Sequence, residues 1–396
     1  SGELVLHNYM DFDDLKDYVK ISYELTQDGL VISKGKLAEV SVAPHSEGKT
    51  NLKVNVQENG KCYLKLIYHL KKEMPLLEEN HILGFDEIEV SQKDAKCQLA
   101  EKWLEKTATD SELQVNEDDT QIHIKGREFA YTIDRRTALF TEMKFAGREY
   151  LNHPMELNIW RAPTDNDMYI KAEWKKAHYD KAYTRAYTTE VVQGKHGVKI
   201  VSHASVVAET VQKILDVTIT WKIDASGKID ADIEAAKDGE FPDLPRFGVR
   251  MFLDKKLSAV RYFGMGPQES YCDKHQAASH GLYRADVGDL HEDYIRPQEN
   301  GSHYDCEYVE LNNSRYGIVV SAENAFSFNA SYYTQEELEK KTHNYELTES
   351  DSVVFCVDYA LNGIGSNSCG PVVLEQYRFD DVLFRFQFTL IPYVKG

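Results

Sequence analysis

The chain alternates apolar and polar residues with a period of two over much of its length. Residues 19–25, 64–70 and 215–223 carry an apolar side chain at every second position. The last of these runs is followed by Asp224-Ala225-Ser226-Gly227 and by a returning alternation over 229–235. Because successive side chains of a strand point to opposite faces, this period indicates strands with one buried face. The pattern predicts antiparallel sheets, with a hairpin at 215–235.

Helical signals are few, and further alternation at 326–332 and 384–390 predicts more strands. The run Thr334-Gln335-Glu336-Glu337-Leu338 has the spacing of a capping box and predicts one short helix. Residues 174–181 are expected to form another. Since strands and helices do not alternate along the chain, a (β/α)₈ barrel is excluded. The predicted fold class is all-β.

A change of character between residues 91 and 119 divides the chain. Lys, Asp and Glu become dense there and the strand pattern is lost, so we predict a linker at 93–117, with one helical turn around Trp103. The domain before it, 1–92, has the size of an immunoglobulin-like β-sandwich. Strands continue without a break over 118–396, which is kept as one domain.

Composition and charge narrow the function classes. The 396 residues are 42% hydrophobic and carry a net charge of −19, which fits a folded protein and argues against nucleic-acid or anionic-membrane partners. No apolar run approaches the roughly 18 residues that cross a bilayer. Neither CxxC nor HExxH occurs, so no metal site is predicted. The six cysteines have no disulfide-framework spacing, and free thiols suit the cytoplasm, where we expect the protein.

A polar loop at 156–167 is the strongest candidate for a site. A strand through Leu157 and Ile159 that stops at Ala162-Pro163 would hold the loop rigidly, since proline fixes its own φ and restricts the residue before it. Asp and Asn fold such turns through side-chain-to-backbone hydrogen bonds. On spacing alone, a plain polar turn between two strands is the favoured interpretation.

The run Trp160-Arg161-Ala162-Pro163-Thr164-Asp165-Asn166-Asp167 resembles a signature of the C-terminal part of glycoside hydrolase family 2 β-galactosidases. Four more runs resemble family blocks in the family's order, and an N-terminal run resembles the opening of the preceding domain. They are residues 262–274, 294–301, 328–334, 365–371 and 8–15.

The resemblance implies an immunoglobulin-like β-sandwich followed by a large galactose-mutarotase-like antiparallel β-supersandwich. In the family, both catalytic glutamates lie in a (β/α)₈ barrel N-terminal to these domains. We therefore expect no catalytic residue in this chain and no hydrolysis by the chain alone. Its partner would be the catalytic barrel, on the same chain or on a large subunit. The complete enzyme would cleave terminal β-galactosides such as lactose with retention, as a homo-oligomer. Its magnesium and sodium would lie outside this part, which needs no cofactor.

The resemblance also places two loops on the sugar-acceptor side of the assembled site. One carries Asp167, Met168 and Tyr169, where the family often has a glycine instead of Tyr169. The other carries Asn367, Ser368 and Cys369. Some members have a tryptophan platform at the position of Cys369, so stacking on the acceptor sugar should be weaker here.

Four further polar residues are predicted to tie loops together: Arg161, Asp165, Glu269 and Glu299. Arg161 is expected to pair with Asp165 or Asp167. Glu269 and Glu299 invite interpretation as a catalytic pair, but loop ties to backbone N–H groups and arginines are favoured. Four histidines in polar loops fit packing better than metal binding: His275, His280, His291 and His303.

Two other functions stay open at this stage. A stand-alone carbohydrate-binding module would bind galactose or lactose directly. An aldose epimerase would need a histidine acid and a carboxylate base in one pocket, and polarimetry would detect its activity.

Overall fold

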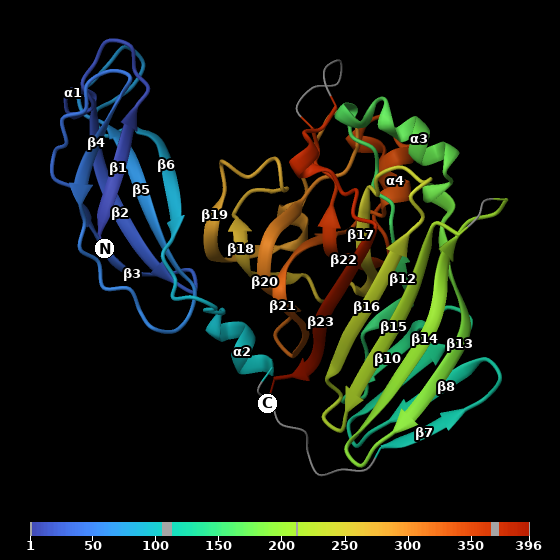
Figure 1. The fold of residues 1–396 in the computed structure, drawn as a ribbon. Helices are drawn as coiled ribbons and strands as arrows, with labels where there is room; N and C mark the ends of the chain where they lie inside the picture. The colour runs from blue at the N-terminus through green and yellow to red at the C-terminus, as the bar shows by residue number, and fades with distance from the viewer. Residues whose placement is uncertain (1, 105–112, 211–212, 366–371, 396) are drawn as a thin grey trace. The chain divides into compact units, whose positions relative to one another are not determined.

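The computed structural model describes residues 2–104, 113–210, 213–365 and 372–395, and it is built almost entirely of antiparallel strands (Figure 1). The chain divides into two compact units. The smaller holds residues 1–101, and the larger holds nearly all of the rest. No helix in these ranges is long and apolar enough to span a membrane.

The smaller unit is a sandwich of a two-stranded and a four-stranded sheet. The first pairs β1 (Glu3–Asn8) with β4 (Ser46–Asn51), and the second has the order β3 (Leu30–Lys36), β2 (Val19–Gln27), β5 (Cys62–Leu70), β6 (Ile82–Glu89). Leu6 of β1 packs with Ile21, Leu64 and Leu66 of the other sheet, since the period of two sends them inward. The short helix α1 (Leu15–Tyr18) begins at Asp14, whose carboxylate accepts the Lys16 N–H at 3.1 Å.

The stretch predicted as a linker contains regular structure at both ends. Helix α2 (Gln98–Leu104) confirms the expected turn around Trp103. Strand β7 (Gln114–Glu117) pairs with β8 (Gln121–Lys125), so the linker prediction is wrong over these four residues. Val115 explains the strand, because it packs on the core of the larger unit although its neighbours are polar.

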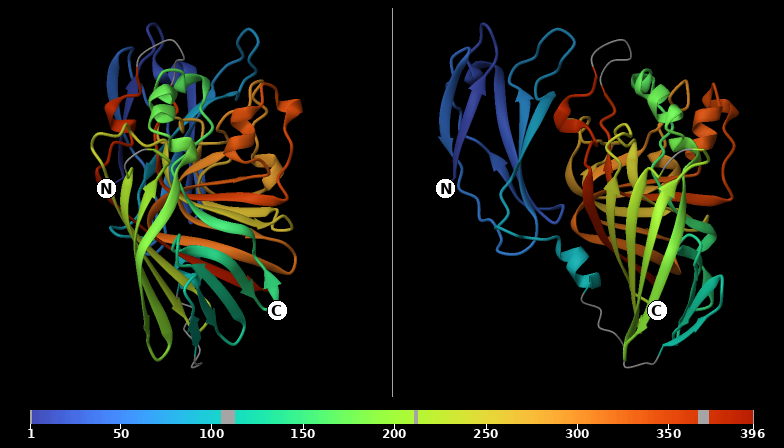
Figure 2. Two further views of the ribbon diagram at one scale, coloured as in Figure 1. Left: turned by 90° about the vertical axis from the view of Figure 1, so that its right-hand side faces the viewer. Right: turned by 45° about the vertical axis from the view of Figure 1, so that its right-hand side comes forward.

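The larger unit contains two sheets. The five-stranded one is completed by β9 (Phe129–Asp134), β10 (Leu139–Phe145) and β11 (Arg148–Glu149). The other has twelve strands: β12 (Leu151–Asn158), β13 (Tyr183–Gln193), β14 (Gly197–Val207), β15 (Leu215–Asp224), β16 (Ile229–Lys237), β17 (Arg246–Asp254), β18 (Ala259–Gly266), β19 (Ser279–Asp286), β20 (Ser302–Asn312), β21 (Tyr316–Ser331), β22 (Ser352–Leu361) and β23 (Leu383–Val394). Figure 2 shows the yellow-green strands β13–β16 side by side in one curved layer.

The hairpin predicted at 215–235 is confirmed as β15 and β16. Trp221 lies opposite Ala231, and the turn uses Gly227 at φ +86° with the Asp224 carboxylate accepting the Ser226 N–H at 2.8 Å. Trp221 is fully buried, lies 4.9 Å from the ring of Phe140, and donates its indole N–H to the carbonyl of Ala138 at 2.8 Å. These contacts join the two sheets around one apolar core.

The larger unit also contains short helices and 3₁₀ turns between its strands. Helix α4 (Gln335–Lys340) confirms the predicted helix, and the Thr334 hydroxyl accepts the Glu337 N–H at 3.1 Å as its N-cap. The Glu337 carboxylate accepts the Thr348 N–H at 2.8 Å. The helix expected at 174–181 begins earlier, as α3 (Ile170–Lys176), and ends in a separate 3₁₀ turn, η2 (Tyr179–Lys181). The other 3₁₀ turns are η1 (Asp165–Asp167), η3 (Val287–Leu290), η4 (Asn344–Glu346) and η5 (Glu375–Tyr377).

Candidate functional site

The polar loop singled out in the sequence leaves β12 at Asn158. The strand was expected to continue through Ile159, but the Asn158 side-chain oxygen accepts the Trp160 N–H at 3.0 Å and turns the chain out of the ladder. Ile159, Trp160 and Ala162 are nonetheless buried. The loop is therefore anchored by packing before it reaches Asp165.

Arg161 is the central tie of this loop. It is fully buried and donates two hydrogen bonds to the Asp167 carboxylate, from Nε to Oδ2 at 3.1 Å and from NH2 to Oδ1 at 2.6 Å. Its remaining donors reach the carbonyls of Asn362 and of Gly363, the latter at 3.0 Å. Burial disfavours the charged guanidinium of Arg161, but the adjacent Asp167 carboxylate stabilises it by more, so the pKa of Arg161 is raised. One side chain thus joins the 159–169 loop to the chain that follows β22.

That second segment, residues 362–365, is held from two further directions. The Asp273 carboxylate accepts the N–H groups of Ile364 at 2.9 Å and Gly365 at 2.8 Å. The Asn166 side chain donates to the Gly365 carbonyl at 2.8 Å. Gly365 has φ +78°, a conformation that side chains rarely adopt. The polar loop therefore meets the 362–365 segment at Asn166 and Gly365.

A cavity of about 250 Å³ lies where these loops meet. Asn166, Tyr169, Gly365, Val373 and Arg378 are among its lining residues, and we call it the acceptor-side cavity. Tyr169 is 63% exposed and Met168 is 46% exposed, so both side chains are open to an arriving ligand. A phenol ring here offers an apolar face and one hydroxyl, which is the combination that sugars contact.

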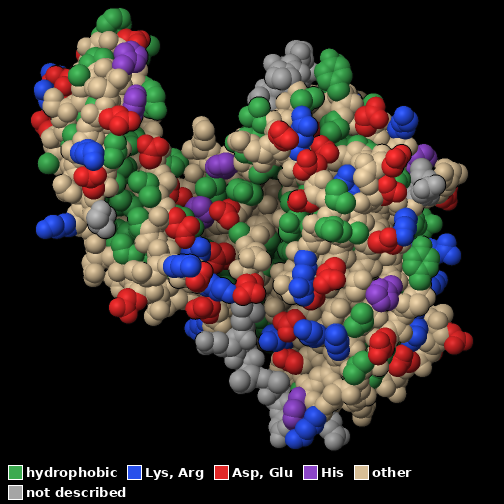
Figure 3. Space-filling view, viewed as in Figure 1, with side chains coloured by type: hydrophobic (Ala, Val, Ile, Leu, Met, Phe, Trp, Pro, Cys, Tyr) green, Lys and Arg blue, Asp and Glu red, His purple; other side chains and the backbone are tan. Residues whose placement is uncertain are grey.

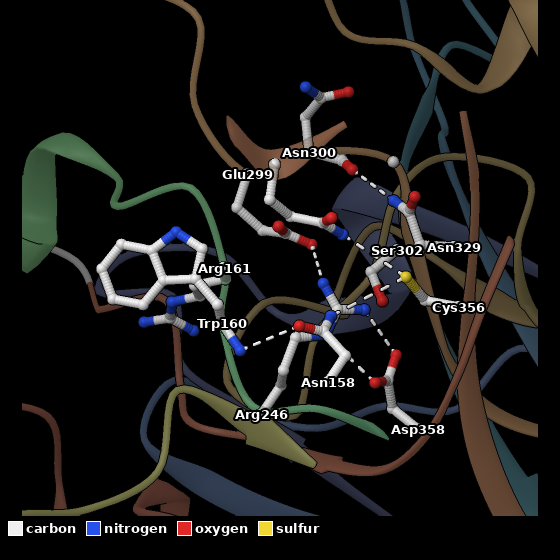
Figure 4. A network of polar contacts seen from close by, with 12 residues as sticks. Asn158, Trp160, Arg161, Arg246, Glu299, Asn300, Ser302, Asn329, Cys356 and Asp358 are labelled. Carbon is white, nitrogen blue, oxygen red and sulfur yellow. Dashed lines mark hydrogen bonds and ion pairs between the residues drawn. The ribbon is translucent and has the colours of Figure 1, made fainter. Parts of the chain in front are cut away.

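A second set of charges lies beneath the loop, which we call the arginine network (Figure 4). Arg246 of β17 binds Asp358 of β22 with its Nε at 3.0 Å from Oδ1, and its NH1 group donates to Glu299 at 3.1 Å. All three side chains are at most 2% exposed. Burial raises the pKa of both carboxyl groups, and Arg246 opposes that shift. The Glu299 N–H donates to the Ala162 carbonyl at 3.0 Å, so the network supports the polar loop from below.

Glu269 and Glu299 are placed as ties. Glu269 accepts the Gly301 N–H at 2.9 Å and further bonds from Lys274 and the Tyr294 hydroxyl. Glu299 is buried behind Arg246. The Glu269 and Glu299 side chains are 6% and 2% exposed, whereas a glycosidase carboxylate must reach the sugar.

The sequence of the chain matches two family models, described as "Beta galactosidase small chain" over residues 125–390 and "Beta-galactosidase, domain 4" over residues 4–91. The chain belongs to the β-galactosidase family. A β-galactosidase of Actinobacillus pleuropneumoniae is 42% identical over 391 residues, which are 99% of this chain and 38% of that protein. One from Staphylococcus xylosus is 31% identical, over 98% of this chain and again 38% of the relative. The chain thus spans about two-fifths of the length of these relatives.

Solved structures give a looser correspondence. A galactose 1-epimerase from Lactobacillus acidophilus superimposes with a TM-score of 0.40 at 9% identity, covering 73% of this chain and 100% of that one. This level of agreement carries no argument about function. The predicted fold class, an immunoglobulin-like sandwich followed by a mutarotase-like supersandwich, agrees with the family models and with the observed sheets.

The structure shows the contacts of two of the predicted site residues, Asp167 and Asp165. Asp167, which was expected to bind substrate, is among the residues that line the acceptor-side cavity, but it is 2% exposed. Its carboxylate accepts three N–H groups, two from Arg161 and one from Thr164 at 2.9 Å. We therefore count it among the loop ties. Asp165 pairs with Gln298, whose side-chain oxygen accepts its N–H at 3.1 Å, and not with Arg161. Asn367, Ser368 and Cys369 lie outside the described residues.

Metal binding finds no support in the described residues. Within them, no group of three or more His, Cys, Asp or Glu side chains is placed to hold an ion. His303 is buried against Phe328, with ring centroids 5.0 Å apart, as a packing histidine.

Sequence reasoning missed Arg246, Asp273, Gln298 and Asp358. Asp273 and Gln298 lie inside family-like runs and were available as polar residues flanking turns. Arg246 and Asp358 stand in ordinary strands 112 positions apart, with no local pattern that joins them.

Proposed function

We propose that this chain forms the acceptor side of a retaining β-galactosidase of glycoside hydrolase family 2, whose catalytic carboxylates come from another part of the longer enzyme. The observation that carries the proposal is the joint between Arg161, Asp167 and the carbonyls of Asn362 and Gly363. It holds two remote loops around one open cavity. The related β-galactosidases are much longer than this chain, which covers 38% of each, so a catalytic domain can lie in the rest of their sequences.

The division of labour follows from the chemistry of retaining hydrolysis. Such an enzyme needs a nucleophile and an acid/base carboxyl about 5–5.5 Å apart, both reaching the scissile bond. Glu269 and Glu299 are occupied as ties, so this chain supplies orientation and exclusion of water. Tyr169 and Met168 would contact the leaving sugar, such as the glucose of lactose.

The natural substrate would be a terminal β-galactoside, and the assembled enzyme a cytoplasmic homo-oligomer. Five cysteines are free thiols in the described ranges, which suits a reducing compartment: Cys62, Cys97, Cys272, Cys306 and Cys356. On the face drawn in Figure 3, Lys and Arg are interspersed with Asp and Glu, and they form no single basic patch there. This distribution agrees with a small-molecule substrate and with no nucleic-acid partner.

The test is hydrolysis of a chromogenic β-galactoside by the chain alone and by the chain mixed with the N-terminal remainder of the enzyme. Activity only in the mixture supports the proposal. Comparable activity of the chain alone would overturn it and return Glu269 and Glu299 as candidate catalysts.

A variant in the mixture locates the acceptor contact. Tyr169→Ala should lower the affinity for added glucose as galactosyl acceptor by about tenfold, the value of roughly 1.4 kcal/mol of lost contact. Tyr187→Ala, which removes a similarly exposed tyrosine from β13, is the matched control and should leave acceptor affinity unchanged. Equal behaviour of the two variants would remove Tyr169 from the site.

A further inference from the structure

Strand β21 changes its partner half-way along one edge. Its residues 316–321 pair with β23, and its residues 327–331 pair with β22. Residues 322–326 have neither partner on that edge, so β22 and β23 part there (Figure 1). A sheet that forks in this way leaves space between the diverging strands, which side chains or a ligand must fill.

A cavity of about 310 Å³ lies beside this fork, and we call it the fork pocket. It is lined by residues of β21 and β22 and by the segment 376–381, which precedes β23. Its walls include Phe326 and Phe379, both buried, and the rings of Tyr304, Tyr359 and Tyr377. Tyr359 is fixed by its neighbours, because its ring stacks on Phe384 at 5.2 Å and contacts Phe379 at 5.8 Å. The pocket therefore presents several aromatic surfaces, one of them rigidly held.

Several polar groups at the same pocket have no hydrogen-bond partner among the described residues. In the described part of the chain, the hydroxyls of Tyr304, Tyr359 and Tyr377 make no hydrogen bond with another residue, and neither does the carboxylate of Asp381. Each tyrosine hydroxyl can donate and accept, and the carboxylate accepts. Burial raises the pKa of Tyr304, Tyr359 and Asp381, which marks the pocket as partly shielded from water.

We propose that the fork pocket is a second saccharide site, which binds one neutral pyranose ring. Aromatic rings cover the apolar C–H face of such a sugar, while hydroxyl and carboxylate groups bond its hydroxyls. The volume lies at the lower end of the range for small-molecule pockets, which suits one ring. The charged residues of the lining are Asp305, Asp381 and Arg378, so carboxylates outnumber the one guanidinium and an anionic ligand fits less well.

The fork pocket is separate from the acceptor-side cavity but adjacent to it, since Arg378 lines both. Binding there needs no catalytic partner, so the inference stands or falls independently of the proposed hydrolysis. The experiment must nevertheless tell the two cavities apart.

The test is calorimetric titration of the full 396-residue chain with methyl β-galactoside and with methyl β-glucoside. We expect millimolar binding of at least one of them, with one site per chain. The variants Asp381→Asn and Tyr377→Ala should each raise the Kd about tenfold, the worth of one charge-assisted hydrogen bond or one ring contact. Both residues are at least partly exposed, so the fold should survive, and near-ultraviolet circular dichroism of each variant checks this.

Three outcomes contradict the proposal. They are no binding of either sugar, binding unchanged in both pocket variants, and binding lost in Tyr169→Ala but kept in the pocket variants. The last result would place the sugar in the acceptor-side cavity. Tyr187→Ala is the control that should bind like the unmodified chain.

Discussion

Arg161→Ala is the perturbation that tests the site most directly. The variant leaves the Asp167 carboxylate buried without its cation and two backbone carbonyls, of Asn362 and Gly363, without their donors. Removing one partner of a buried ion pair typically costs about 3–5 kcal/mol, because the other charge stays desolvated. We expect the free energy of unfolding of the larger unit to fall by that amount.

Arg385→Ala is the matched control. Arg385 also binds an aspartate through two hydrogen bonds, from Nε to Asp232 Oδ1 at 2.7 Å and from NH2 to Oδ2 at 2.6 Å. Its side chain is 53% exposed, so water replaces what the mutation removes. Exposed pairs contribute about 0–1 kcal/mol. The two variants therefore share the residue type and the two-bond contact with an aspartate, and they differ in burial and in the two extra bonds from Arg161 to the carbonyls of Asn362 and Gly363.

The assay is urea unfolding followed by tryptophan fluorescence, because Trp160 and Trp174 lie beside Arg161, whose guanidinium is 5.2 Å from the Trp174 ring. A double variant, Arg161→Met with Asp167→Leu, should recover at least about 1 kcal/mol, since no buried charge is left unpaired. If Arg161→Ala costs no more than Arg385→Ala, the tie does not hold the loop and the argument for the acceptor side fails.

Three further predictions follow from the same structure. Burial lowers the pKa of His303 to about 4, so as the pH falls the unfolded chain is protonated at this histidine before the folded chain is. The free energy of unfolding should therefore be highest above about pH 6.5 and fall by about 2–3 kcal/mol towards pH 4. His303→Phe should remove that part of the difference between unfolding measured at pH 7.5 and at pH 4.5, and an unchanged difference would contradict it. Gly248→Ala should lower the free energy of unfolding by more than about 2 kcal/mol in the same assay, because a Cβ at this position would lie 2.1 Å from the Val357 carbonyl oxygen. An unchanged free energy of unfolding would show that β17 and β22 can separate freely. Cys369→Trp in the assembled enzyme should tighten glucose binding on the acceptor side by stacking, and equal acceptor affinity in the transfer assay would end that hypothesis.

Local patterns predicted the local structure well. The hairpin of β15 and β16 and the helix N-cap at Thr334 depend on residues within a few positions of one another, and both are present. The early start of α3 was missed because Tyr169 and Ile170 carry no capping signal, and the helix forms by burying Trp174. Strand β7 was missed because one apolar residue, Val115, stands among polar ones.

The site was only partly predictable for a different reason. The loop motif showed that Arg161 needed an acidic partner, but not that its other donors would reach Asn362 and Gly363, some 200 positions away. The arginine network is still less visible, since Arg246 in β17 and Asp358 in β22 meet only because these strands pair. Long-range registers of this kind follow from the whole sheet and leave no short sequence pattern.

The burial of these charges itself supports a role for the chain as half of a larger site. A buried ion pair contributes little net stability compared with apolar residues of the same volume, so its value lies in fixing geometry. Arg161 and Asp273 fix the 362–365 segment from opposite sides, while the arginine network supports the loop that carries Tyr169. Under the proposed function, rigid loops are an advantage, because loops that ordered only on ligand binding would lose binding energy to their own entropy. On this argument, weakening the Arg161 tie should lower acceptor affinity in the assembled enzyme even where the chain remains folded.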